Sequence, residues 1–216
     1  PRAVAAPGPA RMTLLREQQV ECPSCGARTA YTLYGAVNVG IDPDLHAGVL
    51  DGTLFTQSCE HCGHPLRNAG YPLMYVNPGA GVLIQVLPHG AGPLTESRRA
   101  VLERAFERRK LGGMRDYRLR LVPDFQRLAE LARVLEADLD DRVIELLKWR
   151  RLRDPALWSR ADPEELPRLA FAGFDFGADD RRLCFSGARS DDGLAFDVAQ
   201  ATYDALAAEI DVLLPW

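Results

Sequence analysis

Two short stretches of the sequence, Cys22-Pro23-Ser24-Cys25-Gly26 and Cys59-Glu60-His61-Cys62-Gly63, share one pattern that decides the fold around them. In each stretch two residues separate a pair of cysteines, so a tight turn can bring both sulfur atoms to one point. The glycine after each pair permits the positive φ with which the chain turns back over the sulfur atoms. Two such turns supply the four sulfur ligands of a tetrahedral zinc site.

The pattern therefore predicts one structural zinc ion bound by Cys22, Cys25, Cys59 and Cys62. Four protein ligands leave no position for water or substrate, so this ion would stabilise the fold without performing chemistry. Residues 26–58 separate the two pairs. This is longer than the roughly 15 to 20 residues usual in such sites and predicts an insertion within the ribbon.

Other chemistries of the same cysteines stay open at this point. Four cysteines can also hold an iron–sulfur centre, and paired cysteines can cycle between thiols and disulfides. His61 or His64 could replace a cysteine ligand, although both are expected to be exposed residues of the turn. The sequence contains no H-E-x-x-H, G-x-S-x-G or P-loop motif, so an enzyme is not the favoured reading.

The composition is that of a globular protein. The 216 residues are 47% hydrophobic and 26% charged, with a net charge of −4. These values argue against a disordered chain and a small disulfide scaffold, and the mild charge argues against a general nucleic-acid coat. No apolar run approaches the roughly 20 residues that span a membrane. We expect a cytoplasmic protein, in which residues 1–11, rich in Pro and Ala, form a disordered tail before Met12.

The first segment reads as a ribbon of strands with an inserted helix. Residues 29–39 are rich in Tyr, Thr and Val and predict a strand. Asp42-Pro43 is expected to open a short helix that Gly52 ends, and residues 53–57 then lead as a strand into the second cysteine pair. The apolar runs 71–76 and 82–87 flank Asn-Pro-Gly-Ala-Gly, which predicts a hairpin.

The middle segment predicts helices around a single strand. Residues 94–109 have helical spacing, and Tyr117, Leu119 and Leu121 alternate with arginines, which predicts a strand with one wet face. Two further helices follow, the first beginning at Pro123. They are joined by a tight acidic turn and are expected to form an antiparallel pair. In that turn, Asp138 is expected to cap the second helix, with Asp141 at its third position.

The C-terminal segment predicts a small β-β-β-α unit. Its strands are expected at residues 169–174, 182–185 and 194–198, and its helix at residues 200–210. The predicted fold class is therefore α+β: a zinc-ribbon-like β segment with an inserted short helix, an antiparallel helix pair and this unit. The predicted domains are the tail 1–11, a ribbon and helical domain 12–153, a proline-rich linker 154–168 and the C-terminal unit 169–216. Cys184 and the tryptophans Trp149, Trp158 and Trp216 are expected to pack in the core.

Five stretches together carry a family resemblance. They are CPSCG at Cys22, CEHCG at Cys59, YPLMYV at Tyr71, YRLRLV at Tyr117 and LEADLDDRVIELLK at Leu135. The chain resembles the CpXC family of bacterial and archaeal proteins over about residues 20–148, and its later FDVAQATYDAL segment is similar to the tail of longer members. The resemblance implies a paired-cysteine, zinc-binding domain and brings no activity with it. Glu60 stands where the family motif has proline, so the second turn should be less rigid.

Three functional hypotheses follow from the sequence. The leading one is a binding or scaffold protein stabilised by structural zinc, with another protein as its partner. The second is a nucleic-acid-associated factor, and the third is a thiol redox enzyme or sensor. The sequence does not indicate an oligomeric state. The candidate nucleic-acid contacts are the basic residues Arg98, Arg99, Arg108, Arg109, Lys110, Arg118 and Arg120.

Overall fold

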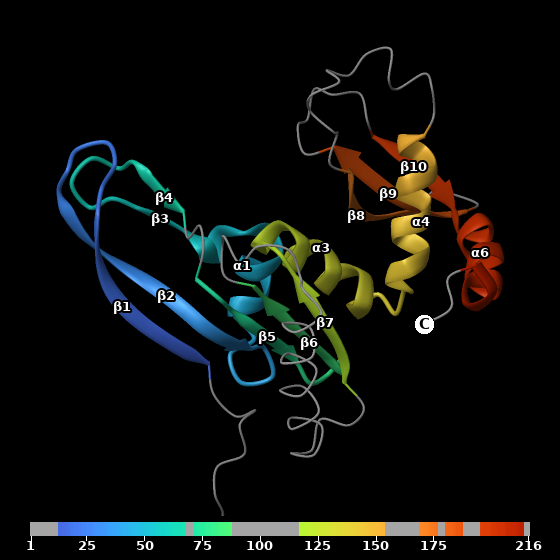
Figure 1. Ribbon diagram of the computed structural model, residues 1–216, viewed down its shortest axis with the longest axis horizontal. Coiled ribbons are helices and arrows are strands. Elements are labelled where there is room, and N and C mark those ends of the chain that lie inside the picture. The colour runs from blue at the N-terminus through green and yellow to red at the C-terminus, as the bar shows by residue number, and fades with distance from the viewer. Residues whose placement is uncertain are drawn as a thin grey trace, which may run out of the picture. The chain divides into compact units, whose positions relative to one another are not determined.

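The computed structural model describes residues 13–67, 71–87, 117–153, 169–176, 180–187 and 195–213 (Figure 1). The chain divides into two compact units, Pro1–Ala132 and Arg133–Trp216, which are treated separately below. Four predicted features lie outside the described residues: the tail 1–11, the helix at 94–109, the linker 154–168, and Trp158 and Trp216. No helix within the described ranges combines the length and apolar character needed to cross a membrane.

A five-stranded mixed sheet forms the frame of the first unit, with strand order β1-β2-β5-β6-β7. The pairs β1–β2 and β5–β6 are antiparallel, whereas β2–β5 and β6–β7 are parallel. A separate two-stranded sheet, β3–β4, lies between β2 and β5 in the sequence. The strands are β1 (Leu14–Glu21), β2 (Arg28–Asn38), β3 (Thr56–Ser58), β4 (Pro65–Arg67), β5 (Met74–Asn77), β6 (Val82–Val86) and β7 (Arg118–Val122).

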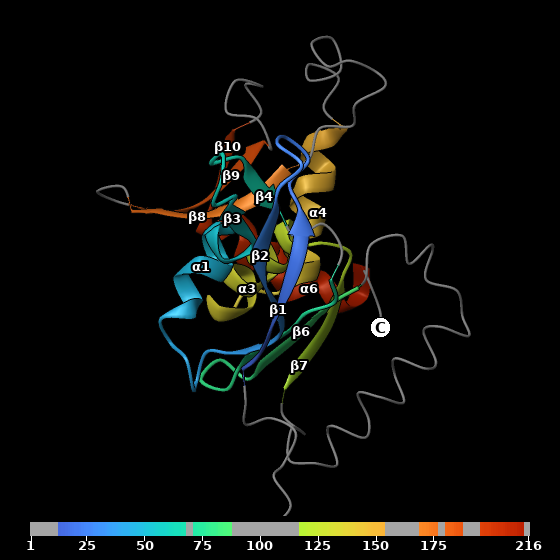
Figure 2. The same ribbon diagram turned by 90° about the vertical axis from the view of Figure 1, so that its left-hand side faces the viewer.

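Alternation along these strands builds a core on the sheet. The register pairs Val37 with Tyr75 and Tyr75 with Ile84, so these three buried side chains form one row. The helices α1 (Leu45–Asp51) and α3 (Phe125–Glu136) lie on the same side of the sheet (Figure 2). Val49 of α1 and Leu128 and Ala132 of α3 are fully buried and add to this core.

The predicted insertion is present, but its boundaries differ from the expected ones. Helix α1 begins at Leu45 rather than at Asp42, and the residue before it, Asp44, makes no side-chain cap. Gly52 ends the helix with φ 80°, as expected. Residues 53–57 were expected to be one strand. Their first three residues instead form a short 3-10 helix, η1 (Thr53–Phe55), and β3 begins only at Thr56.

The second unit is a three-stranded antiparallel sheet packed against helices. Its elements are α4 (Asp141–Leu152), β8 (Leu169–Phe176), β9 (Arg181–Gly187), β10 (Phe196–Ala199) and α6 (Gln200–Leu213), with strand order β10-β9-β8. This confirms the α+β class and the C-terminal β-β-β-α arrangement. One buried cluster joins side chains of α4, the strands and α6: Val143, Ile144, Leu147, Phe171, Leu183, Phe185, Tyr203, Leu206 and Ile210.

Helix α4 therefore shares its core with the C-terminal strands, and this compact unit begins well before residue 169. The reason is that the apolar face of α4 is buried by β8, β9 and α6. The two helices expected at this point, α3 and α4, are both present. Their antiparallel arrangement stays a prediction, because the division between the two compact units falls within α3.

The N-terminus of α4 is capped differently from the prediction. Asp140, not Asp138, is the cap, and its side chain accepts a hydrogen bond from the backbone N–H of Arg142 at 2.9 Å. Asp141 is the first helical residue rather than the third. Asp138 instead takes a positive φ of 56° in the turn, a conformation that aspartate tolerates better than most residues do.

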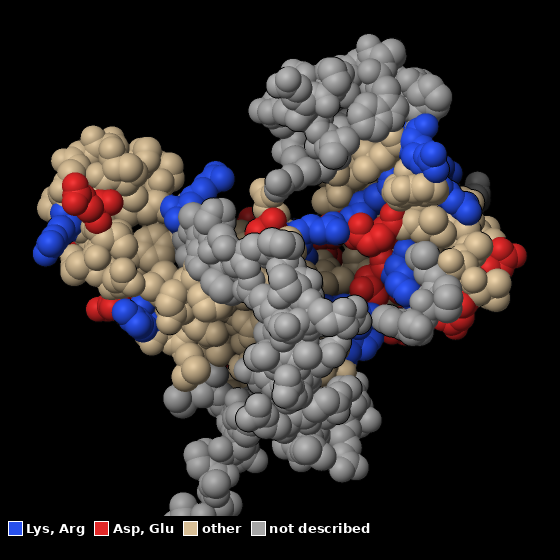
Figure 3. Space-filling model, viewed as in Figure 1, with Lys and Arg blue, Asp and Glu red and all other residues tan. Residues whose placement is uncertain are grey.

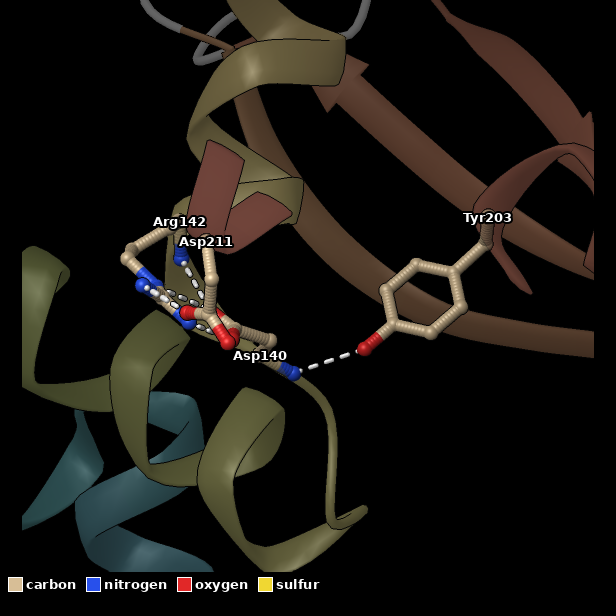
Figure 4. Close-up of polar contacts among 4 residues, drawn as sticks. All are labelled: Asp140, Arg142, Tyr203 and Asp211. Carbon is tan, nitrogen blue, oxygen red and sulfur yellow. Dashed lines mark hydrogen bonds and ion pairs between the residues drawn. The ribbon is translucent and has the colours of Figure 1, made fainter. Parts of the chain in front are cut away.

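Four polar residues tie α6 to this helix end (Figure 4). The guanidinium of Arg142 pairs with Asp140 at 2.7 Å and with Asp211 of α6 at 2.8 Å. The backbone N–H of Asp140 donates to the hydroxyl of Tyr203, also on α6, at 2.7 Å. Burial raises the pKa of Tyr203, so its phenol stays neutral and can accept this bond.

Two side chains expected in the core are placed differently. Trp149 is 53% exposed on α4, and the guanidinium of Arg153 lies over its ring at 4.7 Å. The expectation of core packing is therefore wrong for this tryptophan, whose position on α4 lies outside the buried face. Cys184 on β9 is only partly buried.

On the face shown in Figure 3, charged side chains of both signs gather over α4 and α6 and are sparse at the β1–β2 end.

Replacing Tyr203 with Phe should destabilise the second unit. The substitution keeps the ring but leaves the N–H of Asp140 without its partner, which typically costs about 1–3 kcal/mol. Denaturant unfolding followed by Trp fluorescence would measure the change. Tyr34→Phe is the matched control, because Tyr34 is half-exposed on β2 in the other unit. Equal unfolding midpoints for Tyr203→Phe and the unmodified chain would contradict the expectation.

Candidate metal centre

Both cysteine pairs sit in turns with the same backbone geometry, which we call knuckles. The first knuckle, residues 22–27, joins β1 to β2, and the second, residues 59–64, joins β3 to β4. In each, the N–H of the first cysteine donates to the carbonyl five residues later, and the N–H of the glycine donates back to that cysteine, all at 2.9 Å. Gly26 and Gly63 have φ values of 70° and 71°. Figure 1 shows both knuckles at the same end of the first unit.

The knuckles bring four sulfur atoms into one cluster. The Sγ atoms of Cys22, Cys25, Cys59 and Cys62 all lie within 4.8 Å of one another. Two contacts cross between knuckles: Cys22 to Cys62 at 3.7 Å and Cys25 to Cys59 at 3.8 Å. A tetrahedral ion with Zn–S bonds of about 2.3 Å requires sulfur atoms about 3.8 Å apart, so the donor set fits such an ion.

Burial divides the four ligands into two kinds. The first cysteine of each knuckle is buried, with Cys22 only 1% and Cys59 2% exposed. The second cysteine of each, Cys25 and Cys62, is exposed. The buried pair packs in a small cluster with apolar residues of β2 and β4, so one side of the centre faces protein and the other faces solvent.

The second knuckle is attached to β2 by polar contacts that the sequence does not reveal. The Gln57 side chain accepts from the backbone N–H of Thr32 at 3.0 Å and donates to its carbonyl at 2.9 Å, as a neighbouring strand would. The hydroxyl of Tyr31 donates to the carbonyl of Phe55 at 2.8 Å. These bonds bring the start of β3 against β2, and with it the second cysteine pair.

The second knuckle makes one more hydrogen bond to β2, and its two histidines lie outside the sulfur cluster. The N–H of Glu60 donates to Oγ1 of the buried Thr29 at 3.4 Å. His61 is exposed, and its Nε2 lies 3.3 Å from the carbonyl of Arg28, whereas His64 is partly buried. The cluster of ligand atoms contains the four cysteines and neither histidine.

The thiols perturb one another strongly. Burial raises the pKa of Cys22, but N–H groups of Cys25 and Ser24 and the neighbouring thiols of Cys62 and Cys25 outweigh this and lower it to about 7. For Cys25, a backbone bond from Ala27 lowers the pKa, whereas the bonds to the other thiols and burial raise it to about 12. One thiolate thus forms readily, and the next costs much more. A dication would remove this penalty by compensating the charge.

The predicted basic contacts are only partly described. Arg98, Arg99, Arg108, Arg109 and Lys110 lie outside the described residues. Arg118 and Arg120 are half-buried on β7, where each guanidinium donates to a backbone carbonyl, of Ala80 and Leu119 respectively.

The sequence and the knuckle geometry agree with a comparison against known families. The model of the CpXC protein family matches residues 20–148, more than half of the chain. The chain belongs to the CpXC family. Neither the curated proteins nor the solved structures contain a match.

The CpXC match ends before the C-terminal strands and helix α6. It includes both knuckles and ends at residue 148, within α4. The residues of α6 that hold the start of α4, Tyr203 and Asp211, therefore lie beyond the part that the family model covers. The same holds for β8, β9 and β10.

Replacing Gly63 with Ala should weaken metal binding. The Cβ of alanine would meet nothing within 4 Å, so the cost comes only from the positive φ, about 1 kcal/mol or roughly fivefold in affinity. Competition with a chromogenic chelator would measure the change. Gly79→Ala is the control, because Gly79 lies in the β5–β6 turn away from the centre. An equal loss of affinity in both variants would argue against a role for knuckle geometry.

Proposed function

We propose that the four cysteines bind one zinc ion that is structural. The observation that carries this is the cluster of four sulfur atoms with cross-knuckle contacts of 3.7 and 3.8 Å, close to the spacing around tetrahedral zinc. Two C-x-x-C pairs, each in a knuckle, are typical of structural zinc sites, and this favours zinc over an iron–sulfur cluster. With all four positions occupied by protein, the ion would have no place for a reacting ligand.

The ion would supply folding energy to the β3–β4 end of the first unit. Strands of three residues in a two-stranded sheet are not stable alone, and the buried cluster around Cys22 and Cys59 is small. Structural zinc sites contribute on the order of 10 kcal/mol, which would hold this end in place. The protein is then a zinc-stabilised binding or scaffold module rather than an enzyme.

The partner we propose is another protein that adds a strand to β1. Within the described residues β1 pairs only with β2, so its other edge offers backbone donors and acceptors. Seven of its eight residues are exposed, among them Leu14 at 49% and Leu15 at 62%. Strand addition uses such an edge for affinity and exposed apolar side chains for specificity. Of the candidate nucleic-acid contacts, the described Arg118 and Arg120 each donate to a backbone carbonyl, and the nucleic-acid alternative stays open.

Metal removal tests the structural role. Strong chelation, or Cys25→Ser, should unfold the knuckle end, because three remaining thiols cannot compensate the lost ligand. Amide NMR signals of β3 and β4 should collapse toward random-coil values. The control is Cys184→Ser, which removes the one cysteine outside the cluster and should leave zinc content at one per chain. A metal-free chain that keeps the native β3–β4 signals would sink the proposal and favour a thiol redox role.

A photoreactive residue tests the partner surface. Placed at Leu15, it should give a discrete cross-linked protein in cells, and the product should disappear when Cys25→Ser is added, because the first knuckle joins β1 to β2. Placed at Val212, which is 85% exposed on α6, it should give no such product. Equal cross-linking at both positions, or none at Leu15, would count against β1.

A further inference from the structure

The two sides of the metal centre differ in a way that a purely structural site does not require. Each knuckle places its first cysteine in the protein and its second in solvent. The thiol contacts then run across the centre, from exposed Cys25 to buried Cys59 and from exposed Cys62 to buried Cys22. In each of these two contacts, an exposed cysteine of one knuckle meets a buried cysteine of the other.

We propose that Cys25 and Cys62 are modification sites at which the centre reacts with hydroperoxides, and that Cys59 and Cys22 complete the reaction as cross-knuckle disulfides. The inference rests on the metal centre proposed above, because metal binding keeps the cysteines as thiolates, the nucleophilic form. Exposure then decides which thiolate a solute can reach.

The chemistry balances with a hydroperoxide as the oxidant. The Cys25 thiolate attacks one oxygen of the O–O bond, which breaks to give a sulfenic acid and an alkoxide or hydroxide that takes a proton from water. The Cys59 thiolate then attacks that sulfur, the S–S bond forms and hydroxide leaves. Two thiolates have lost two electrons to the peroxide. A second equivalent oxidises Cys62 and Cys22 in the same way, and the ion, without ligands, is released.

Geometry favours links across the centre over links within a knuckle. Cys25 and Cys59 already lie at 3.8 Å, and the backbone bonds of both knuckles hold each turn in its ligating shape. A link across the centre leaves those backbone bonds in place. Oxidation would therefore exchange the ion for two covalent links between the same turns, and thiol reductants would reverse the exchange.

The sequence allows a direct test by peptide mapping. Trypsin cuts after Arg16, Arg28 and Arg67, so Cys22 and Cys25 leave on one peptide, 17–28, and Cys59 and Cys62 on another, 29–67. The full chain carrying Cys184→Ser would be loaded with zinc, its metal content measured, and then treated with hydrogen peroxide. Released zinc would be followed with a chromogenic chelator before non-reducing digestion.

The expected product is one species in which two disulfides join the two peptides, with one zinc released per chain, and fragmentation should assign Cys22–Cys62 and Cys25–Cys59. Two separate peptides with internal disulfides would overturn the proposal, as would retention of zinc without any disulfide. If no zinc is bound before treatment, the proposed metal centre fails instead, so the two failures are distinguishable.

A second measurement compares the alkylation rates of the four cysteines. Limiting N-ethylmaleimide on the zinc-loaded chain should label Cys25 and Cys62 first, about tenfold faster than the buried pair. A matched reaction on the denatured chain controls for intrinsic reactivity. Equal labelling of all four cysteines in the loaded chain would show that exposure does not select the reactive sulfur atoms.

Discussion

The convergence of four cysteine sulfur atoms from two separate knuckles is the constraint on which the first unit depends. All four Sγ atoms lie within 4.8 Å of one another, and the contacts described above leave the pKa of Cys22 at about 7 and that of Cys25 at about 12. In the proposed centre, a dication would compensate the negative charge of the thiolates. Apart from the centre, β3 and β4 pair with each other and are held by hydrogen bonds between Gln57 and Thr32, Tyr31 and Phe55, and Glu60 and Thr29, and by a small buried cluster. In the proposed function, charge compensation by the ion would therefore keep this end of the sheet ordered.

The second unit depends on contacts between helix α4 and the C-terminal elements. The region that the CpXC model matches ends within helix α4, and the apolar face of this helix is buried by elements beyond that region. Its first turn is also completed from α6, where Tyr203 accepts the N–H of Asp140 and Asp211 neutralises part of the charge on Arg142. Helix α4 thus shares one buried core with the C-terminal strands and α6.

Local chemistry explains which features could be predicted from the sequence. The knuckles follow from cysteine spacing and the glycines at positive φ, and the strands follow from alternation, because each signal is local. The start of α4 could not be assigned in the same way, since Asp138, Asp140 and Asp141 are all competent caps, and the contacts of Asp140 with Arg142 and the distant Tyr203 appear only in the structure. Gln57 carries no signal at all, because its role depends on facing the backbone of Thr32 across the fold. The exposure of Trp149 does not follow from the sequence. Aromatic residues are usually buried, and a single sequence does not show which face of α4 is covered.

The repeated knuckle suggests how the proposed centre would combine stability with reactivity. Both turns use the same bonds and the same glycine conformation, so each buries its first cysteine and exposes its second. Two copies of this asymmetry face one another, so two of the four cysteines are buried against the apolar cluster and two are exposed. A thiolate reacts only where an electrophile can approach it, so burial of a cysteine protects it and exposure leaves it open to solutes. In the proposed centre, Cys25 and Cys62 would therefore be the reactive ligands, and Cys22 and Cys59 would hold the ion against the apolar cluster.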